Sequence, residues 1–331
     1  MTADHGPILI VGGPTASGKS AMALDLALHF GGVVINADSM QIYRELRILS
    51  ARPNSADEKR APHRLYGTLP ASERCSAGRW RDLALAEIRD AQANGLLPIL
   101  VGGTGLYFRS LLNGLAPVPA ISPEIRKHAT ALHREIGAAE FFKQLSKRDP
   151  EGAARLHAGN TQRVLRAYEV MAATGKSLAE WQRSQPEGDG YPGKISALVL
   201  EPPREALYAA CNARAEIMAS SGGIEEAGTL LALDLDPTLP AMKALGVREF
   251  SAYLSGDVTR DEAVDKLRQG TRRYAKRQST WFRHQMPEAK TIAARYGDRL
   301  ADEIRQTAGA LLKASPLTGS ARSRQRPATD K

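Results

Sequence analysis

The sequence predicts an α/β protein with a parallel β-sheet core and an inserted segment made only of helices. Short runs of Val, Ile and Leu alternate with helical stretches in the first part of the chain, which is typical of buried parallel strands. Residues 122–181 carry several helix start signals and no strand candidate, and another strand candidate follows at 195–200. We therefore expect an α/β core with C-terminal helices (1–120 and 191–314), a helical insertion domain (121–190) and a disordered tail (315–331).

Length and composition limit the possible number of domains, the kind of partner and the location of the protein. The chain has 331 residues, of which 43% are hydrophobic, so it is long enough for two domains with a buried core. A net charge of +9 indicates a polyanionic partner, although a basic tail gives the same sign. Cys75 and Cys211 form no zinc-binding or C-x-x-C pattern, and no apolar run could cross a membrane. We expect a cytoplasmic protein that does not associate with membranes and acts as a monomer.

The first strand candidate, residues 8–11, leads directly into a phosphate-binding loop. Residues 13–20 read G-x-x-x-x-G-K-S, and a helix-forming stretch follows as far as Gly31. A loop between a strand and a helix N-terminus directs free backbone N–H groups at a phosphate. Lys19 adds a positive charge, and the Ser20 hydroxyl is a candidate ligand for Mg²⁺. A glycine-rich turn without a ligand is the alternative, which the flanking strand and helix disfavour. The predicted phosphate-binding residues are Gly13, Pro14, Thr15, Ala16, Ser17, Gly18, Lys19 and Ser20. They indicate a P-loop NTPase-like core.

A second strand candidate, residues 33–38, ends in Asp38. Ligands of open α/β sheets bind beyond the carboxyl ends of the strands, so we expect Asp38 to lie near the phosphate loop. Its carboxylate could act as a general base, bind a metal ion or cap a helix.

Residues 50–73 are polar, contain three prolines and are expected to form a long loop. A helix at 79–94 and a third strand at 96–101 follow. This strand is not followed by an acidic residue, which argues against an ATPase or GTPase. Thr104 begins the next helix, where its hydroxyl could either enter the site or cap the helix.

Four helices are predicted in the insertion, with starts at Ser122, Asp149, Asn160 and Ser177. The third is expected at 161–174. One face carries apolar side chains and another carries polar and basic ones, which either contact RNA or are simply solvated. The apolar face contains Val164, Tyr168 and Met171, and the basic face contains Gln162, Arg163 and Arg166.

Beyond the strand at 195–200, we expect helices at 205–220 and 224–233 and a long helix from Thr259 to about His284. A basic stripe on the long helix indicates contact with a phosphate backbone, or else a solvated face beside a packed one. The stripe contains Arg268, Arg272, Arg273, Lys276, Arg277 and Arg283. The packed face is expected to contain Val264, Leu267, Thr271, Tyr274, Gln278 and Trp281.

Six motifs along this chain resemble those of the tRNA dimethylallyltransferase (tRNA isopentenyltransferase) family, and together they cover residues 8–283. They are the segments 13–20 (GPTASGKS), 38–43 (DSMQIY), 61–65 (APHRL), 101–107 (VGGTGLY), 162–167 (QRVLRA) and 275–282 (AKRQSTWF). Two stretches, 49–53 and 244–248, depart from the family pattern, which leaves their roles open.

This resemblance implies transfer of a dimethylallyl group from dimethylallyl diphosphate to the exocyclic amine of the adenosine 3′ of the anticodon. It implies Mg²⁺ as cofactor and the tRNA anticodon stem-loop as partner, and it leaves open whether ATP also binds the phosphate loop. The implied catalytic residues are Asp38, Thr15, Lys19 and Thr104. The implied tRNA-binding residues are Asp38, Ser39, Met40, Gln41, Thr104, Arg126, Gln162, Arg163, Val164, Leu165 and Arg166. An adenylate prenyltransferase, a small-molecule P-loop kinase and a non-catalytic RNA-binding protein are the alternatives.

Overall fold

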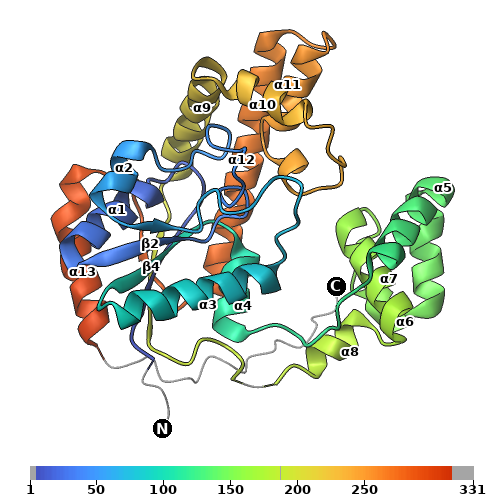
Figure 1. Cartoon of the computed structure of the whole chain (residues 1–331), viewed down its shortest axis with the longest axis horizontal. Helices are drawn as coiled ribbons and strands as arrows, with labels where there is room; N and C mark the ends of the chain where they lie inside the picture. Colours follow the sequence, from blue (N-terminus) through green and yellow to red (C-terminus); the bar gives the residue numbers. More distant parts are fainter. Residues whose placement is uncertain (1–4, 187, 315–331) are drawn as a thin grey trace. The chain divides into compact units, whose positions relative to one another are not determined.

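The computed structural model describes residues 5–186 and 188–314 (Figure 1). The chain divides into two compact units. One is Leu112–Tyr191, and the other is formed by the chain before and after it. The insertion expected from the sequence, 121–190, begins nine residues later and ends one residue earlier. The tail expected at 315–331 lies outside the described residues.

Six parallel strands form the sheet of the larger unit, in the order β3-β2-β4-β1-β5-β6. The central strands are buried along their length, because helices cover both faces, and this explains their continuous apolar runs. The predicted α/β class with a P-loop-like parallel sheet is confirmed. The strands are β1 (Ile8–Gly12), β2 (Gly32–Asn36), β3 (His63–Arg64), β4 (Leu97–Gly102), β5 (Ile195–Leu200) and β6 (Lys290–Ile292).

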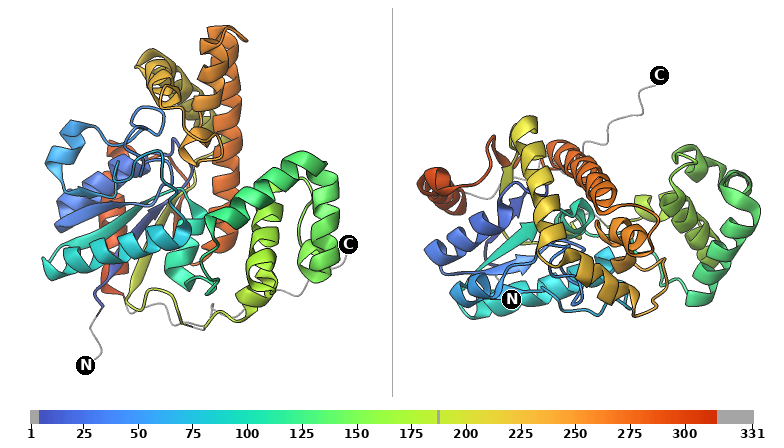
Figure 2. Two further views of the ribbon diagram at one scale, coloured as in Figure 1. Left: turned by 45° about the vertical axis from the view of Figure 1, so that its right-hand side comes forward. Right: turned by 90° about the horizontal axis from the view of Figure 1, so that it is seen from above.

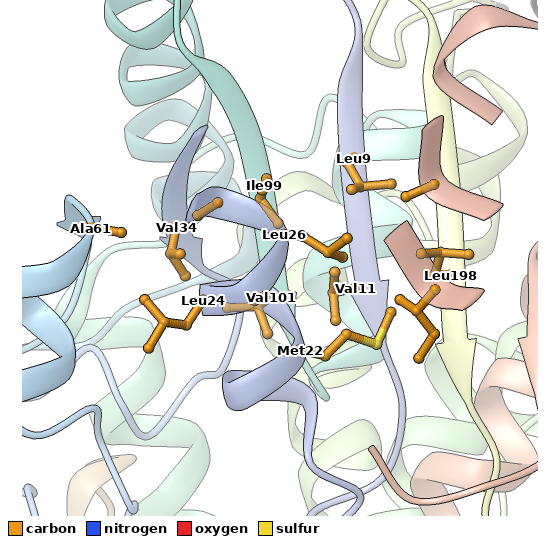
Figure 3. Packing of buried hydrophobic residues seen from close by; sticks show 14 of the residues in the cluster. Leu9, Val11, Met22, Leu24, Leu26, Val34, Ala61, Ile99, Val101 and Leu198 are labelled. Atoms are coloured by element: carbon orange, nitrogen blue, oxygen red, sulfur yellow. The ribbon is translucent and has the colours of Figure 1, made fainter. Parts of the chain in front are cut away.

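One face of the sheet is covered by α1 (Lys19–Phe30) and α13 (Ala301–Lys313). Met22 and Leu26 of α1 lie on the helix face that meets the side chains of β1, β4 and β5 (Figure 3). Ile304 of α13 joins the same cluster. The helix that follows the phosphate loop is therefore fixed to the sheet by its buried face, which fixes the loop as well.

On the opposite face lie α3 (Ala77–Ala93), α4 (Gly105–Asn113) and the end of α12 (Arg260–Gln285). Trp80 of α3 stacks on Tyr107 of α4 with 4.5 Å between ring centroids, and its indole N–H donates to the Asn36 carbonyl at 2.8 Å. Phe282 of α12 packs over Gly12, where an added Cβ would lie 2.5 Å from the ring. These contacts draw the carboxyl ends of β1, β2 and β4 together with α12.

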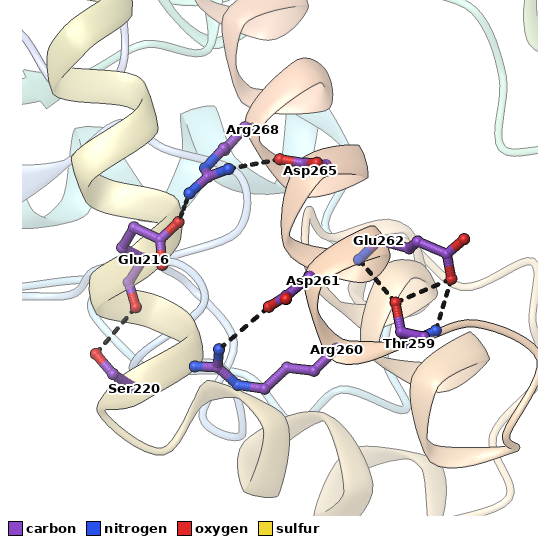
Figure 4. A network of polar contacts seen from close by, with 8 residues as sticks. All are labelled: Glu216, Ser220, Thr259, Arg260, Asp261, Glu262, Asp265 and Arg268. Atoms are coloured by element: carbon purple, nitrogen blue, oxygen red, sulfur yellow. Dashed lines mark hydrogen bonds and ion pairs between the residues drawn. The ribbon is translucent and has the colours of Figure 1, made fainter.

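The C-terminal helices are α9 (Arg204–Ser220), α10 (Gly223–Leu231), α11 (Val247–Leu254) and α12, with α9 packed along α12 (Figure 2). The predicted capping box at Thr259 is present, with Glu262 bonded to the Thr259 N–H at 2.7 Å (Figure 4). Arg268 pairs with Glu216 of α9 and with Asp265 (Figure 4). It therefore joins two helices and does not belong to a free basic stripe.

Two expectations for this unit are wrong. The stretch 50–73 is not all loop, because it contains α2 (Ser55–Arg60) and β3. The helix α2 is capped by Asn54, and none of its residues is buried. Its sequence therefore has no need of the apolar periodicity by which a packed helix is recognised. On α12, Ala275 and Phe282 take the fully buried positions, whereas Tyr274 and Trp281 are only half-buried.

The smaller unit contains α5 (Pro123–Arg148), α6 (Pro150–Ala154), α7 (Thr161–Thr174) and α8 (Leu178–Arg183). Its four predicted N-caps are confirmed: the side chain of each accepts a hydrogen bond from the backbone of the first turn. Phe141, Leu145, Val164 and Tyr168 form the centre of a separate hydrophobic core. Over the described residues of both units, no helix is long and apolar enough to cross a membrane.

Candidate active site

The phosphate loop connects β1 to α1 with two glycines in conformations that other residues rarely adopt. Gly13 has φ of 142°, and a Cβ there would lie 2.7 Å from the Leu200 carbonyl oxygen. Gly18, with φ of 95°, precedes α1, and within the described ranges no side chain caps that helix. The N–H groups of the first turn are therefore open to an anion, which the helix dipole also favours.

The loop is braced by distant parts of the chain. Gln278 of α12 accepts a hydrogen bond from the Thr15 N–H at 2.8 Å and donates one to the Gly103 carbonyl at 3.0 Å. The Tyr296 N–H donates to the Ser17 carbonyl at 3.0 Å, and the Arg295 guanidinium donates to that of Ala16 at 3.1 Å. The sequence gives no signal for these contacts beyond the presence of Gln278 in a family motif.

Three charged groups gather at the loop. Burial lowers the pKa of Lys19 to about 8; the Asp38 carboxylate opposes this shift and the Arg214 guanidinium adds to it. Burial also lowers the pKa of Arg214, again opposed by Asp38. The Lys19 ammonium donates to the Pro14 carbonyl at 2.7 Å. Arg214, on α9, is a site residue that the sequence analysis missed, because a single arginine in a helix carries no pattern.

Asp38 lies just beyond β2, in a turn that fixes its carboxylate. Its backbone N–H donates to the Asn36 side chain at 2.8 Å, and its Oδ1 accepts from the Met40 N–H at 2.9 Å. This is an Asx-type turn, and no helix begins there, so the reading of Asp38 as a helix cap is wrong. The side chain is half-buried beside Lys19, as expected from its place at the strand end.

Thr104 connects the β4–α4 junction to the Asp38 turn. Its Oγ1 accepts from the Ser39 N–H at 2.9 Å, and its own N–H donates to the Ala37 carbonyl at 3.3 Å. The same hydroxyl donates to the Ser39 hydroxyl at 3.3 Å. Burial raises the pKa of the nearby Tyr274. The Thr104 hydroxyl therefore faces the site, and its contacts are with the neighbouring turn.

Ser39, Met40 and Gln41 are half-buried in the same turn. The Gln41 amide nitrogen donates to the carbonyls of Ser50 and Ala51 at 3.0 and 3.1 Å. Both bonds use the amide nitrogen, so the amide oxygen, Oε1, is the side-chain atom that could accept a hydrogen bond from a ligand.

Among the described residues, no three acidic, histidine or cysteine side chains form a metal-binding group. Mg²⁺ commonly uses one or two protein oxygens together with phosphates and waters, so such a group is not required. Ser20 is exposed on the first turn of α1. The Ser17 hydroxyl is buried and has no hydrogen-bond partner in the described structure. Both hydroxyls fit a site for a phosphate with its metal.

The remaining RNA-binding candidates lie in the smaller unit. Arg126 of α5 and Gln162 and Arg163 of α7 are exposed, while Arg166 is half-buried and pairs with Glu169 at 3.5 Å. Leu165 is partly buried against the core of this unit. Val164 is only 1% exposed within that core. Its side chain packs in the core, as its place on the apolar face of the helix indicates, so it does not itself offer a surface to RNA.

The fold and the loop define a class of P-loop proteins in which a phosphate site and a carboxylate meet at the sheet edge. Comparison with known families narrows the class. A model described as IPP transferase matches residues 41–285, and one described as isopentenyl transferase matches residues 7–74. The chain belongs to the IPP transferase family.

Relatives and solved structures agree with this assignment. A tRNA dimethylallyltransferase of Rhodospirillum centenum is 56% identical over 288 residues, which are 86% of this chain and 90% of that protein. One from Rhodopseudomonas palustris is 48% identical and covers 92% and 96%. The crystal structure of the tRNA isopentenylpyrophosphate transferase of Bacillus halodurans has a TM-score of 0.67 at 32% identity, with coverage of 93% and 97%. The predicted family and enzyme class, a prenyltransferase, are confirmed.

Proposed function

We propose that this protein transfers a dimethylallyl group from dimethylallyl diphosphate to the N6 amine of the adenosine 3′ of the anticodon in tRNA. The observation that carries the proposal is the phosphate loop with Lys19, in a chain of this family, close to Arg214 and the Asp38 turn. Arg214 and Gln41 of that turn bond the same carbonyl, that of Ser50. Two cations suit a diphosphate leaving group, and a carboxylate suits an amine that must lose a proton.

In the proposed reaction, the adenosine nitrogen attacks the terminal allylic carbon. The carbon–oxygen bond to the diphosphate breaks, and the leaving group departs with the electron pair. Lys19, Arg214 and the N–H groups of the first turn of α1 stabilise this charge. The Asp38 carboxylate accepts the proton from the amine. Thr15 belongs to the loop that encloses the diphosphate, and Thr104 holds the Asp38 turn through Ser39.

We infer that Mg²⁺ binds with the donor. The Ser20 hydroxyl and the donor phosphates would hold the ion, and the buried Ser17 hydroxyl is placed to bond a phosphate oxygen. When bound, the ion supplies charge neutralisation at the diphosphate.

The target base must leave the anticodon-loop stack to reach Asp38. Basic side chains on two helices support a phosphate-backbone contact. In α12 an open hollow of about 410 Å³ is lined by Arg273, Lys276, Arg277 and Thr280. In α7 the exposed Arg163 and the half-buried Arg166 provide further positive charge. We also propose that the enzyme is cytoplasmic and monomeric. Light scattering in solution tests the oligomeric state, and cell fractionation tests the location.

The experiment is to incubate the protein with radiolabelled dimethylallyl diphosphate, Mg²⁺ and unmodified tRNA, and to measure label in the RNA. We expect incorporation at one adenosine, located by nuclease digestion. Label on free AMP would indicate an adenylate prenyltransferase. Phosphate transfer from ATP would indicate a kinase. Binding of tRNA without incorporation would indicate a non-catalytic RNA-binding protein.

A further inference from the structure

A single carboxylate holds the turn that follows the Asp38 segment. Glu226, in the first turn of α10, accepts hydrogen bonds from three successive backbone N–H groups, those of residues 47, 48 and 49, at 2.8, 2.7 and 2.9 Å. Bonds to a charged acceptor are stronger than those between neutral groups. This contact joins two segments that are far apart in the sequence, and it orders a stretch of chain that has no regular secondary structure.

Packing reinforces the same contact. The Leu49 side chain fits against Gly223 and Gly246, where an added Cβ would lie 3.1 and 2.6 Å from its Cδ2 atom. The stretches 49–53 and 244–248, whose roles the sequence leaves open, therefore pack on each other. Only glycine leaves room for Leu49 at position 246, which also has φ of 97°.

The next carbonyl along the chain, that of Ser50, reaches the candidate active site. It accepts a hydrogen bond from Gln41 Nε2 at 3.0 Å and another from Arg214 Nη2 at 3.1 Å. Gln41 belongs to the Asp38 turn, and Arg214 lies in the electrostatic environment of both Asp38 and Lys19. The position of Ser50 therefore affects two groups at once: the segment that carries Asp38, through Gln41, and the Arg214 guanidinium.

We propose that Glu226 is a positioning residue for the transfer reaction. It anchors the 47–49 turn, and through the Ser50 carbonyl it orients Gln41, which belongs to the Asp38 turn, and Arg214. This inference rests on the proposed function. The phosphate loop itself is braced by Gln278, Arg295 and Tyr296 and has no bond to Glu226 in the described structure. Loss of Glu226 should therefore disturb the geometry of the reaction more than donor binding.

The test compares Glu226→Gln with Glu225→Gln. Both substitutions remove one negative charge from the first turn of α10, but Glu225 is exposed, and only the first removes an acceptor oxygen of the 47–49 turn. Glutamine keeps the size of the side chain and replaces one acceptor oxygen with an NH₂ group. Steady-state kinetics with dimethylallyl diphosphate and tRNA give kcat and both KM values. Amide hydrogen exchange reports the 47–49 turn and, as a measure of overall folding, strands β1 and β4.

For Glu226→Gln we expect kcat to fall about 10- to 100-fold, since small displacements of reacting groups cost up to about 10². The donor KM should rise by a smaller factor than kcat falls, because Arg214 is displaced while Lys19 and the phosphate loop stay in place. Amides 47–49 should exchange about tenfold faster or more, with β1 and β4 unchanged. The Glu225→Gln variant should match the wild type in all measurements.

Three results would overturn the role of Glu226: a kcat equal to that of Glu225→Gln, unchanged exchange at 47–49, or a joint loss of kcat, donor affinity and protection of β1 and β4. The third result would indicate general destabilisation. The wild type tests the proposed function separately. If it transfers no label to tRNA, the proposed function fails whatever the variants do, whereas an active wild type with an equally active Glu226→Gln variant refutes only the role of Glu226.

Discussion

Burial at the start of α1 lowers the pKa of Lys19 to about 8, which places its titration within the range of an enzyme assay. An unfolded chain holds this proton up to a pKa of about 10.4. Between these two values the unfolded state binds more protons than the folded state, so this group makes stability rise with pH. Affinity for a diphosphate should change in the opposite direction, because the ammonium charge that attracts the anion is lost.

We therefore expect kcat/KM for dimethylallyl diphosphate to fall above pH 8, by up to about tenfold per pH unit. A Lys19→Arg variant keeps its charge throughout, so its profile should stay level to about pH 10 even if its absolute rate is lower. Initial rates at limiting donor and saturating tRNA give both profiles. A decline in the arginine variant with the same midpoint would assign the titration to another group.

Asp38 allows a similar test of its role as base. Asparagine can still accept the Met40 N–H through its oxygen, so Asp38→Asn should keep the turn but lose the proton acceptor. General base catalysis contributes about 10²–10⁴-fold, and we expect single-turnover transfer to fall by that factor. Donor affinity, measured by calorimetry, should change little. Loss of donor affinity together with Mg²⁺ dependence would instead make Asp38 a metal ligand.

At the scale of elements, α12 is the helix that connects the two sides of the site. Gln278 is buried, and its amide satisfies the Thr15 N–H and the Gly103 carbonyl at once. Replacing it with leucine leaves both groups without a partner, so Gln278→Leu should lower the free energy of unfolding by about 1–3 kcal/mol per group. It should also raise the donor KM, because the loop loses a brace.

Urea denaturation and donor titration measure these two effects. Gln269→Leu is the matched control, since Gln269 is exposed on the same helix. A Gln278→Leu variant as stable as this control would show that water or a shifted side chain replaces the lost bonds.

The helix α7 gives a prediction about RNA. If Arg163 and Arg166 contact tRNA phosphates, the double Arg163→Ala/Arg166→Ala variant should make the plot of log affinity against log salt shallower by roughly 0.7–0.9 per contact. Filter binding from low to moderate salt gives the slope. Arg89→Ala, an exposed change on α3, should leave it unaltered. An unchanged slope in the double variant would remove α7 from the interface.

The elements that the sequence predicts correctly are those with local signals. β1, β2, β4 and β5 are continuous apolar runs, and Ser122, Ser177 and Thr259 cap their own helices. The phosphate loop is also local, because one loop and one helix end form it. Two of the missed elements have no local signal: α2 has no buried residue, and β6 has three residues, of which two are exposed. The helices α11 and α13 were not predicted either, although each has buried residues on one face.

The candidate site shows the same limit. Asp38 could be placed near the loop because strand ends share an edge of the sheet. Arg214, Glu226 and Tyr296 could not be placed, since each reaches the site or its supporting turn through contacts between distant segments. Tertiary packing alone brings them there.

At the scale of the whole molecule, the two units have separate hydrophobic cores. In the proposed function, the larger unit binds the diphosphate and the helical unit contacts tRNA. Phe141 is fully buried in the core of the helical unit. Phe141→Ala should destabilise that unit by about 3–5 kcal/mol and lower tRNA affinity. Affinity for pyrophosphate at the phosphate loop should stay unchanged, because the loop belongs to the other unit. Calorimetry with pyrophosphate and filter binding with tRNA separate the two, with His128→Ala as an exposed control on α5. A parallel loss of both affinities would refute this independence.

The long-range bracing of the phosphate loop also affects how the protein is made. Thr15 and Ala16 leave the ribosome long before their partners, because Gln278 lies 263 residues after Thr15, and Arg295 lies 279 residues after Ala16. At about 5–20 residues per second, the loop waits roughly 15–55 seconds for these partners. A nascent chain therefore carries the loop sequence for this time without the contacts that hold the loop in shape, and a chain that terminates before α12 never acquires them.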